Sequence, residues 1–271
     1  MLRTSLAAPA TLPFANHDLA PYLPAVHATL NDTPVLAHLD TGAPFVAMGT
    51  SRASHLGIDL TPLGEGHHGT TSTTAYTGTA SELRLGPATL TDVPVTAMPT
   101  LTGAQDVVII GTNVFQQFLT TIDSPAGSLR LAPRGTPPPV DGTRVPFGLW
   151  DDHYLYARGG FGTRDDCRWF IDSGLVYLIA ADEGPPRQAS LMTTAALCRT
   201  FGIESPAPHF EASVPLRLGP LTQARPFVAT APDPVPWSTF GDVPIDGLLS
   251  HGFLKQYAWT LDFDRSEFIL A

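Results

Sequence analysis

Positive charge is scarce in this chain, and lysine is almost missing. The 271 residues hold 15 Lys and Arg against 25 Asp and Glu, which gives a formal net charge of −10, and Lys255 is the single lysine. A phosphate backbone or an anionic membrane surface would repel such a protein. We therefore expect no nucleic-acid partner.

Long apolar runs are also missing. None approaches the ~18 residues that a membrane-spanning helix needs, so no membrane span is expected. Residues 1–10 contain one Arg but lack the apolar core of a secretion signal. The compartment stays open between the cytoplasm and a secreted or periplasmic form without its targeting segment.

Cysteine is rare, with only Cys167 and Cys198. Without a secretion signal, two free thiols are at least as consistent with the sequence as one disulfide. Proline (27) and glycine (24) are abundant instead, and no long helical periodicity occurs. Together with 43% hydrophobic residues, this composition predicts a globular, all-β chain of many short strands and turns.

One short motif occurs twice. Residues 35–39 form an apolar, mostly β-forming run that ends at Asp40, followed by Thr41 and Gly42. A lone D-T-G is explained by a strand and a tight turn. However, Asp172, Ser173 and Gly174 follow a second apolar strand, and the separation of 172 − 40 = 132 residues is close to half the chain.

Other segments repeat with nearly the same spacing. Residues 12–14 (L-P-F) are answered by 145–147 (V-P-F), and 85–87 by 218–220 (both L-G-P), each at an offset of 133. Such spacing indicates internal duplication and pseudo-twofold symmetry. The Pro-rich segment 133–144 is predicted to link two halves, residues 1–134 and 135–271.

The two D-[TS]-G loops resemble those of pepsin-like and retropepsin-like aspartic proteases, which carry one per lobe or per subunit. Ile109-Ile110-Gly111 resembles the second hallmark of this family, a buried strand that packs under the loop. The resemblance implies a single-chain, monomeric aspartic endopeptidase. Its fold would be two pseudo-twofold-related, closed barrel-like lobes with short helices.

The resemblance also implies site residues. Asp40 and Asp172 would be catalytic, and the hydroxyls of Thr41 and Ser173 would bond across to the opposite loop. Gly42 and Gly174 would permit the turns and offer N–H groups to the carboxylates. Two such carboxyl groups ~3 Å apart share one proton and activate a water without a metal or cofactor, an effect for which the aspartic protease dyad is the standard example.

The substrate would be an extended peptide between the lobes. Residues 74–80 lie where a flap would close over the cleft, so Tyr76 and Gly78 are candidate substrate contacts. Phe45 and Tyr177 are candidate cleft walls. Each aromatic residue has an equally ordinary interpretation as a core residue, and the second half shows no obvious flap.

The sequence departs from the family at three positions. Ala43 and Leu175 stand where pepsin-like members place a hydroxyl that favours the ionised carboxylate, so we expect a pH optimum less acid than pepsin's. Leu175 is bulky enough to crowd the dyad, and Ser250 replaces a glycine. These departures favour an alternative hypothesis, a catalytically weak or inactive peptide-binding module. A glycosidase carboxylate pair ranks last, because its chemistry does not require repeated D-[TS]-G loops.

A glycine-rich segment, residues 64–69, fits the letters of a dinucleotide-binding loop. No apolar strand precedes it and no helix pattern follows, so the match is rejected. His67 and His68 have no partner ligands at metal-site spacing and are expected to face water. No metal or cofactor is predicted.

Overall fold

The protein is described by a computed structural model covering residues 2–18, 22–68, 71–101, 107–139, 141–179, 186–203, 208–231 and 243–271. This part of the chain is all-β with four short helices. None of these helices has the length and apolar character needed to cross a bilayer. The side chains of His67 and His68, and residues 69 and 70 that follow, lie outside the described residues.

In its described residues, the first half contains eleven strands and two helices. They are β1 (Arg3–Ser5), β2 (Ala10–Pro13), β3 (Ala25–Leu30), β4 (Thr33–Leu39), β5 (Val46–Gly49), α1 (Thr50–His55), β6 (Thr61–His68), β7 (Thr71–Leu85), β8 (Ala88–Met98), β9 (Val107–Ile110), α2 (Thr112–Phe115), β10 (Leu119–Asp123) and β11 (Ser128–Ala132).

The second half contains the remaining elements. They are β12 (Thr143–Trp150), β13 (Tyr154–Phe161), β14 (Arg164–Asp172), β15 (Leu178–Ile179), β16 (Arg187–Gln188), β17 (Leu191–Thr194), α3 (Ala195–Thr200), β18 (His209–Glu211), β19 (Leu216–Leu218), β20 (Leu221–Gln223), β21 (Phe227–Ala231), β22 (Gly247–Ser250), α4 (His251–Leu254), β23 (Ala258–Asp262) and β24 (Glu267–Leu270).

Six strands of the first half close into a barrel in the order β8-β5-β9-β4-β3-β7, with β7 pairing back to β8. The tight β3–β4 hairpin follows from its turn residues, since Asn31 and Asp32 both adopt positive φ (47° and 58°), as a two-residue type I′ turn requires. Alternate residues of these strands, such as Val26 and Leu39, fill the interior with no exposed surface.

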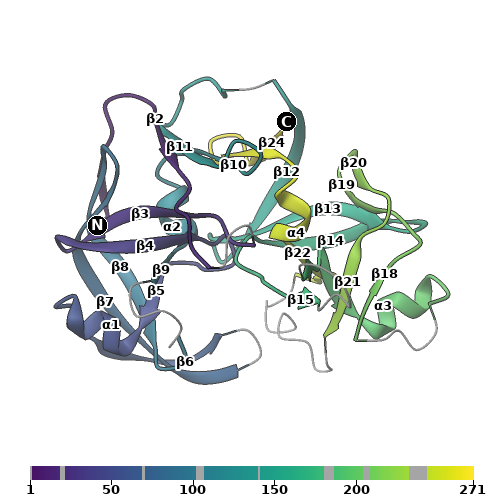
Figure 1. The fold of residues 1–271 in the computed structure, drawn as a ribbon, viewed down its shortest axis with the longest axis horizontal. Helices are drawn as coiled ribbons and strands as arrows, with labels where there is room; N and C mark the ends of the chain where they lie inside the picture. Colours follow the sequence, from purple (N-terminus) through teal and green to yellow (C-terminus); the bar gives the residue numbers. More distant parts are fainter. Residues whose placement is uncertain are drawn as a thin grey trace.

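The second half repeats this strand order. Here β13-β14-β22-β17 corresponds to β3-β4-β9-β5, β19 corresponds to β7, and β20 with β21 replaces the single long strand β8. Pro226 lies at the break between β20 and β21, consistent with its missing backbone donor. The two barrels lie side by side, the first in purple and blue and the second in green (Figure 1).

A third, six-stranded layer joins the two barrels in the order β2-β11-β10-β23-β24-β12, three strands from each half. It lies above both barrels in the view of Figure 1. At its centre β10 pairs with β23, and Thr121 faces Thr260 with their hydroxyl oxygens 2.8 Å apart. Both threonines begin a T-[IL]-D sequence in their own half. Equivalent residues therefore meet at the pseudo-twofold axis.

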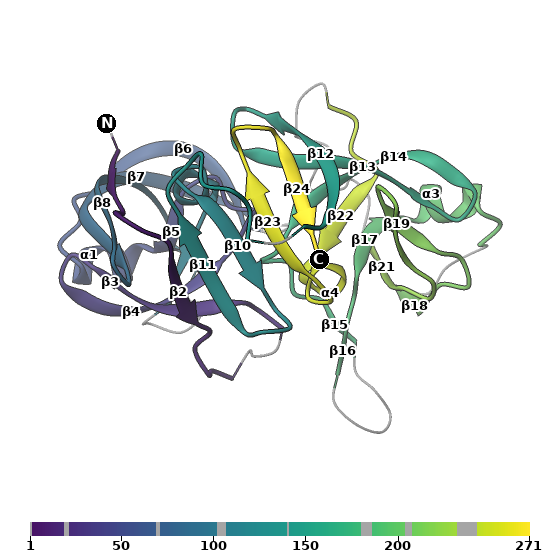
Figure 2. The same ribbon diagram turned by 90° about the horizontal axis from the view of Figure 1, so that it is seen from above.

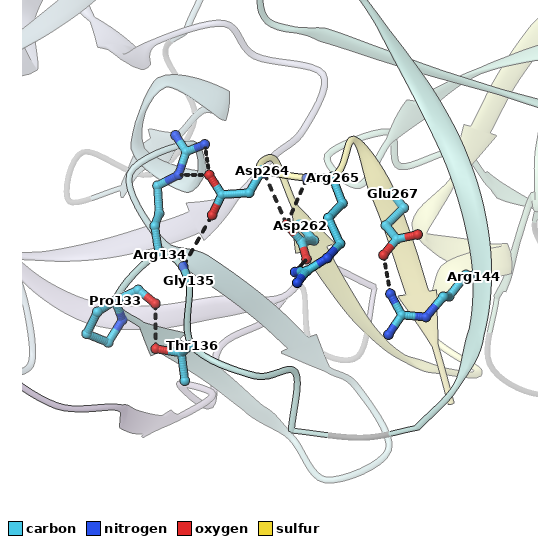
Figure 3. A network of polar contacts seen from close by, with 9 residues as sticks. All are labelled: Pro133, Arg134, Gly135, Thr136, Arg144, Asp262, Asp264, Arg265 and Glu267. Carbon is cyan, nitrogen blue, oxygen red and sulfur yellow. Dashed lines mark hydrogen bonds and ion pairs between the residues drawn. The ribbon is translucent and has the colours of Figure 1, made fainter.

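Polar contacts hold the connecting segment on the β23–β24 hairpin (Figure 3). Asp264 accepts from Nε of Arg134 at 2.9 Å and from the backbone of Gly135 at 3.2 Å. Within the hairpin, the buried Asp262 pairs with Arg265 at 2.8 Å. The connection between the halves is thus fixed to the layer that joins them.

The halves differ after their D-[TS]-G loops. In the first half, β6 and β7 form a long hairpin where the sequence predicted a flap. The second half has a short hairpin, β15–β16, directly after its loop, and it projects from the body of the molecule (Figure 2). Cys167 and Cys198 are both buried and free, so the open question of a disulfide is answered by two thiols.

Candidate active site

Parallel strand pairs bring the two acidic loops to the same place. Asp40 directly follows β4, which runs parallel to β9, and its N–H donates to the carbonyl of Ile110 at 3.0 Å. Asp172 ends β14, which runs parallel to β22 with Asp172 opposite Ser250. Each acid therefore stands at the carboxyl end of a central strand of its barrel.

The two loops are linked by a reciprocal set of buried hydrogen bonds. The Thr41 hydroxyl donates to the carbonyl of Ile171 at 2.7 Å, and the Ser173 hydroxyl donates to the carbonyl of Leu39 at 2.8 Å. Each hydroxyl also accepts the N–H of the opposite loop, at 3.1 Å from Ser173 and 3.0 Å from Thr41. Both side chains are fully buried, so these bonds fix one loop against the other.

The glycines of the loops are required for a different reason from the one predicted. Neither Gly42 nor Gly174 has positive φ among the described residues, so the turns do not need them. Instead, a Cβ at Gly42 would lie 2.7 Å from the carboxyl carbon of Asp172, and one at Gly174 would lie 2.2 Å from that of Asp40. Only glycine allows each loop to approach the opposite carboxylate.

The two carboxyl groups contact each other and differ in surroundings. Oδ1 of Asp40 accepts from Gly42 at 2.7 Å and from Gly174 at 3.1 Å. The N–H of Gly174 also lies 3.1 Å from Oδ1 of Asp172, so it is shared by the two carboxyl groups. Burial raises the pKa of Asp40, while the N–H donors, first that of Gly42, act against this rise. Burial, and then the charge of Asp40, raise the pKa of Asp172 well above its usual range. Asp40 accepts from Gly42 and Gly174, so it is the better site for a negative charge.

Three aromatic rings, one from the first half and two from the second, lie close together. The negative charge of Asp40 reaches Tyr154, whose pKa is raised mainly by burial. The Tyr154 ring lies 4.6 Å from His153, and His153 lies 5.5 Å from Phe45 of the first half. Phe45, a predicted cleft wall, is thus in an aromatic group with contributions from both halves. Tyr154 was not among the predicted site residues, although the duplication makes it the counterpart of Tyr22.

The other predicted substrate contacts lie in different surroundings. Tyr76 on β7 is half-buried and packs against the main core. Gly78 passes close to the backbone of Asp59, where a Cβ would lie 2.7 Å from its carbonyl oxygen. Tyr177 packs in a small cluster with Ile179, near His209. The described contacts of these three residues do not include either acidic loop.

Leu175 and Ser250, two of the three sequence departures, have defined contacts. The side chain of Leu175 packs on Phe170 and Leu248, and its carbonyl accepts from Gln188 at 3.3 Å. The same Gln188 amide also reaches the carbonyl of Tyr22 at 3.1 Å, which ties the second-half hairpin to the first half. The hydroxyl of Ser250 accepts from Gly252 at 2.9 Å and so caps α4. Within the described residues, no group of three or more His, Cys, Asp or Glu is arranged to hold a metal ion.

Part of the first half is similar to a known protein family. The sequence profile described as aspartyl protease matches residues 26–114, which contain the Asp40 loop and the strands around it. Among curated proteins, none matches the chain. A retropepsin-like aspartic protease from Rickettsia conorii is similar in structure, with 17% identity over 48% of this chain and 92% of its own, at a TM-score of 0.36.

The profile match falls on a barrel built around the Asp40 loop. Residues 26–114 of this all-β chain are therefore similar to aspartyl proteases.

Proposed function

We propose that this protein is a single-chain, monomeric aspartic endopeptidase in which Asp40 and Asp172 together activate a water. The observation that carries this proposal is the N–H of Gly174, which lies 3.1 Å from Oδ1 of both half-buried carboxyl groups, on loops 132 residues apart that the hydroxyls of Thr41 and Ser173 hold together. One carboxyl group from each of two halves, residues 1–134 and 135–271, then completes one site.

The electrostatics support a division of roles. Asp40 receives the N–H groups of Gly42 and Gly174, so it is the ionised partner and takes a proton from the water. Asp172, whose pKa is raised well above its usual range by burial and by Asp40, keeps its proton and polarises the scissile carbonyl. The water oxygen bonds to the carbonyl carbon. A proton then passes to the amide nitrogen as the C–N bond breaks.

The substrate of this proposal is an extended peptide lying between the halves. The β6–β7 hairpin of the first half would cover it, with Tyr76 and Gly78 on that hairpin. Phe45, beside His153 and Tyr154, supports an apolar or aromatic side chain near the cut bond. Tyr177 would take part only through the hairpin that follows the second loop.

Cleavage of a denatured protein across pH 3–7 tests the proposal. We expect Asp40→Asn and Asp172→Asn each to lower turnover by at least ~100-fold, because each removes a group that moves a proton in the reaction. Asp59→Asn changes an exposed carboxylate of the first half and serves as the control. Fragment masses from internal cuts distinguish an endopeptidase from an enzyme that trims chain ends.

Two outcomes would overturn the proposal. Wild-type activity in either Asn variant would remove that carboxylate from the mechanism. Peptide binding by the wild-type protein without any turnover would establish the alternative of a binding module, which the bulky Leu175 beside the second loop favours.

A further inference from the structure

A cavity of about 420 Å³ lies on the second half, over β12, β13 and β14, and does not include the acidic loops. Three arginines, Arg144, Arg158 and Arg168, are among its lining residues. The whole chain has 15 Lys and Arg and a net charge of −10, so three arginines in one cavity make a local exception.

The cavity belongs to a face that also carries the candidate dyad. Side chains alternate along a strand, so Asp172, Phe170 and Arg168 point to one side of β14, while Cys167, Trp169 and Ile171 are buried on the other. On β13 the corresponding outward residues are Tyr154, Tyr156 and Arg158. The ring of Tyr154 lies 5.7 Å from that of Phe170, which is buried. Asp172 and Arg168 thus lie on one side of β14, with the buried Phe170 between them.

Two of the arginines face each other across two strands. Arg158 on β13 is directly opposite Arg168 on β14, an arrangement in which like charges destabilise a sheet. In the described part of the chain neither guanidinium forms an ion pair or hydrogen bond. The acids beside them, Asp166 and Asp246, are both paired with Arg164. Arg144, in contrast, pairs with Glu267.

The wall beside the arginine pair is shaped by Tyr156. Its ring approaches Gly148 of β12, where a Cβ would be 2.3 Å from Cζ. Gly148 therefore lets the tyrosine lie against the strand. The cavity thus combines two arginines that have no ion-pair partner among the described residues with one aromatic wall.

We propose that Arg158 and Arg168 form a subsite for an acidic side chain of the bound peptide, a proposal that rests on the proposed endopeptidase function. Arg168 is four residues before Asp172 on β14, which is a distance of about 13 Å at ~3.3 Å per residue. An extended peptide covers that distance in about four residues. The favoured substrate carries Asp or Glu three to five residues from the cut bond.

Matched peptides test this subsite. Peptides that share one cleavable core carry Glu or Gln three, four or five residues from the cut bond, on either side, with both ends blocked. At pH 5.5 the glutamate is ionised. For one placement we expect kcat/KM to be about fivefold higher for the Glu peptide, mainly through KM, as for a partly exposed ion pair. The preference should fall as NaCl is raised.

Enzyme variants assign the preference to the arginines. The double variant Arg158→Gln, Arg168→Gln should cut Glu and Gln peptides equally, and it should not unfold at a lower temperature, because it removes a like-charge pair. Arg144→Gln is the matched control, since this arginine lines the same cavity but is already paired with Glu267. It should keep the fivefold ratio.

The failure of the subsite and the failure of the enzyme are distinguishable. Equal cleavage of all blocked Glu and Gln peptides by the wild type, or an unchanged ratio in the double variant, overturns the subsite and leaves the endopeptidase intact. A preference that appears only with a free peptide C-terminus assigns the arginines to a terminal carboxylate and also overturns it. If no peptide is cut, binding of fluorescent Glu and Gln peptides to wild type and double variant still measures the ratio.

Discussion

The backbone N–H of Gly174 donates to Oδ1 of Asp40 at 3.1 Å, although 134 residues separate the two. The same N–H lies 3.1 Å from Oδ1 of Asp172 in its own loop. One donor therefore serves both acids of the candidate dyad. Gly42 contributes a donor only to Asp40, so the two loops are similar in sequence but unequal in the negative charge they stabilise.

Because the two acids receive different backbone donors, we expect alanine at Gly174 and alanine at Gly42 to lower turnover by different amounts. A Cβ at position 174 would lie 2.2 Å from the carboxyl carbon of Asp40, and one at position 42 would lie 2.7 Å from that of Asp172. We expect Gly174→Ala to abolish turnover and Gly42→Ala to lower it less, because the first displaces the ionised acid and its shared donor. Kinetics of both variants with one peptide check the order. The reverse order would refute the assignment of charge to Asp40.

Removing the buried hydrogen bonds of the Thr41 hydroxyl should lower the free energy of unfolding. Thr41→Val keeps the shape of the side chain but leaves the carbonyl of Ile171 and the N–H of Ser173 without their partner. Each unsatisfied buried group costs about 1–3 kcal/mol. Urea unfolding should show this decrease, while Thr41→Ser, which keeps the hydroxyl, should stay close to wild type. A Thr41→Val variant as stable as Thr41→Ser would mean that these bonds do not hold the loops.

The regular spacing of the sequence predicted the duplicated barrels but concealed a rearrangement. The L-G-P turns at 85–87 and 218–220 keep the offset of 133, whereas β5 and β17 are 191 − 46 = 145 residues apart. The second half has gained about 12 residues as the β15–β16 hairpin and lost as many from the region of the long β6–β7 hairpin. Equal offsets at both ends of a region do not require equal structure within it.

Residue contacts that depend on strand register could not be predicted from the sequence. The juxtaposition of Asp40 and Asp172 was predictable because two copies of one motif imply twofold symmetry. The pairing of Arg158 with Arg168 depends on the alignment of β13 with β14, which a bulge between Gly159 and Phe161 adjusts. At Gly42 and Gly174 the close approach is to a carboxyl group of the opposite half, which local turn rules do not consider.

We expect a hydroxyl side chain in place of Ala43 to shift the pH dependence of the reaction. A hydroxyl at this position would donate to the Asp40 carboxylate and favour its ionised form, which lowers the pKa of that group. We expect Ala43→Ser to move the acid limb of the kcat/KM profile to lower pH, since that limb reports ionisation of the catalytic base. Ala43→Cys has similar size but a weak donor, and it should leave the limb in place. An unchanged limb in Ala43→Ser would contradict this account of the departure.

The raised pKa of Asp172 predicts that the stability of the fold depends on pH. Burial and the charge of Asp40 raise its pKa above the value in the unfolded chain, so the native state binds more protons there than the unfolded state. The free energy of unfolding therefore falls as pH rises from 3.8, the pKa of Asp172 in the unfolded chain, through its raised pKa in the native state. Above the native pKa the whole loss of stability remains.

Asp172→Asn removes this cost because an amide does not ionise. The variant should melt at a higher temperature than wild type at pH 7–8, by about 2–4 °C for each kcal/mol regained, and the difference should vanish at pH 3. Asp59→Asn, at an exposed carboxylate, should show no such trend. A melting difference for Asp172→Asn that is the same at pH 3 and pH 8 would show that packing, not ionisation, sets the stability of this site.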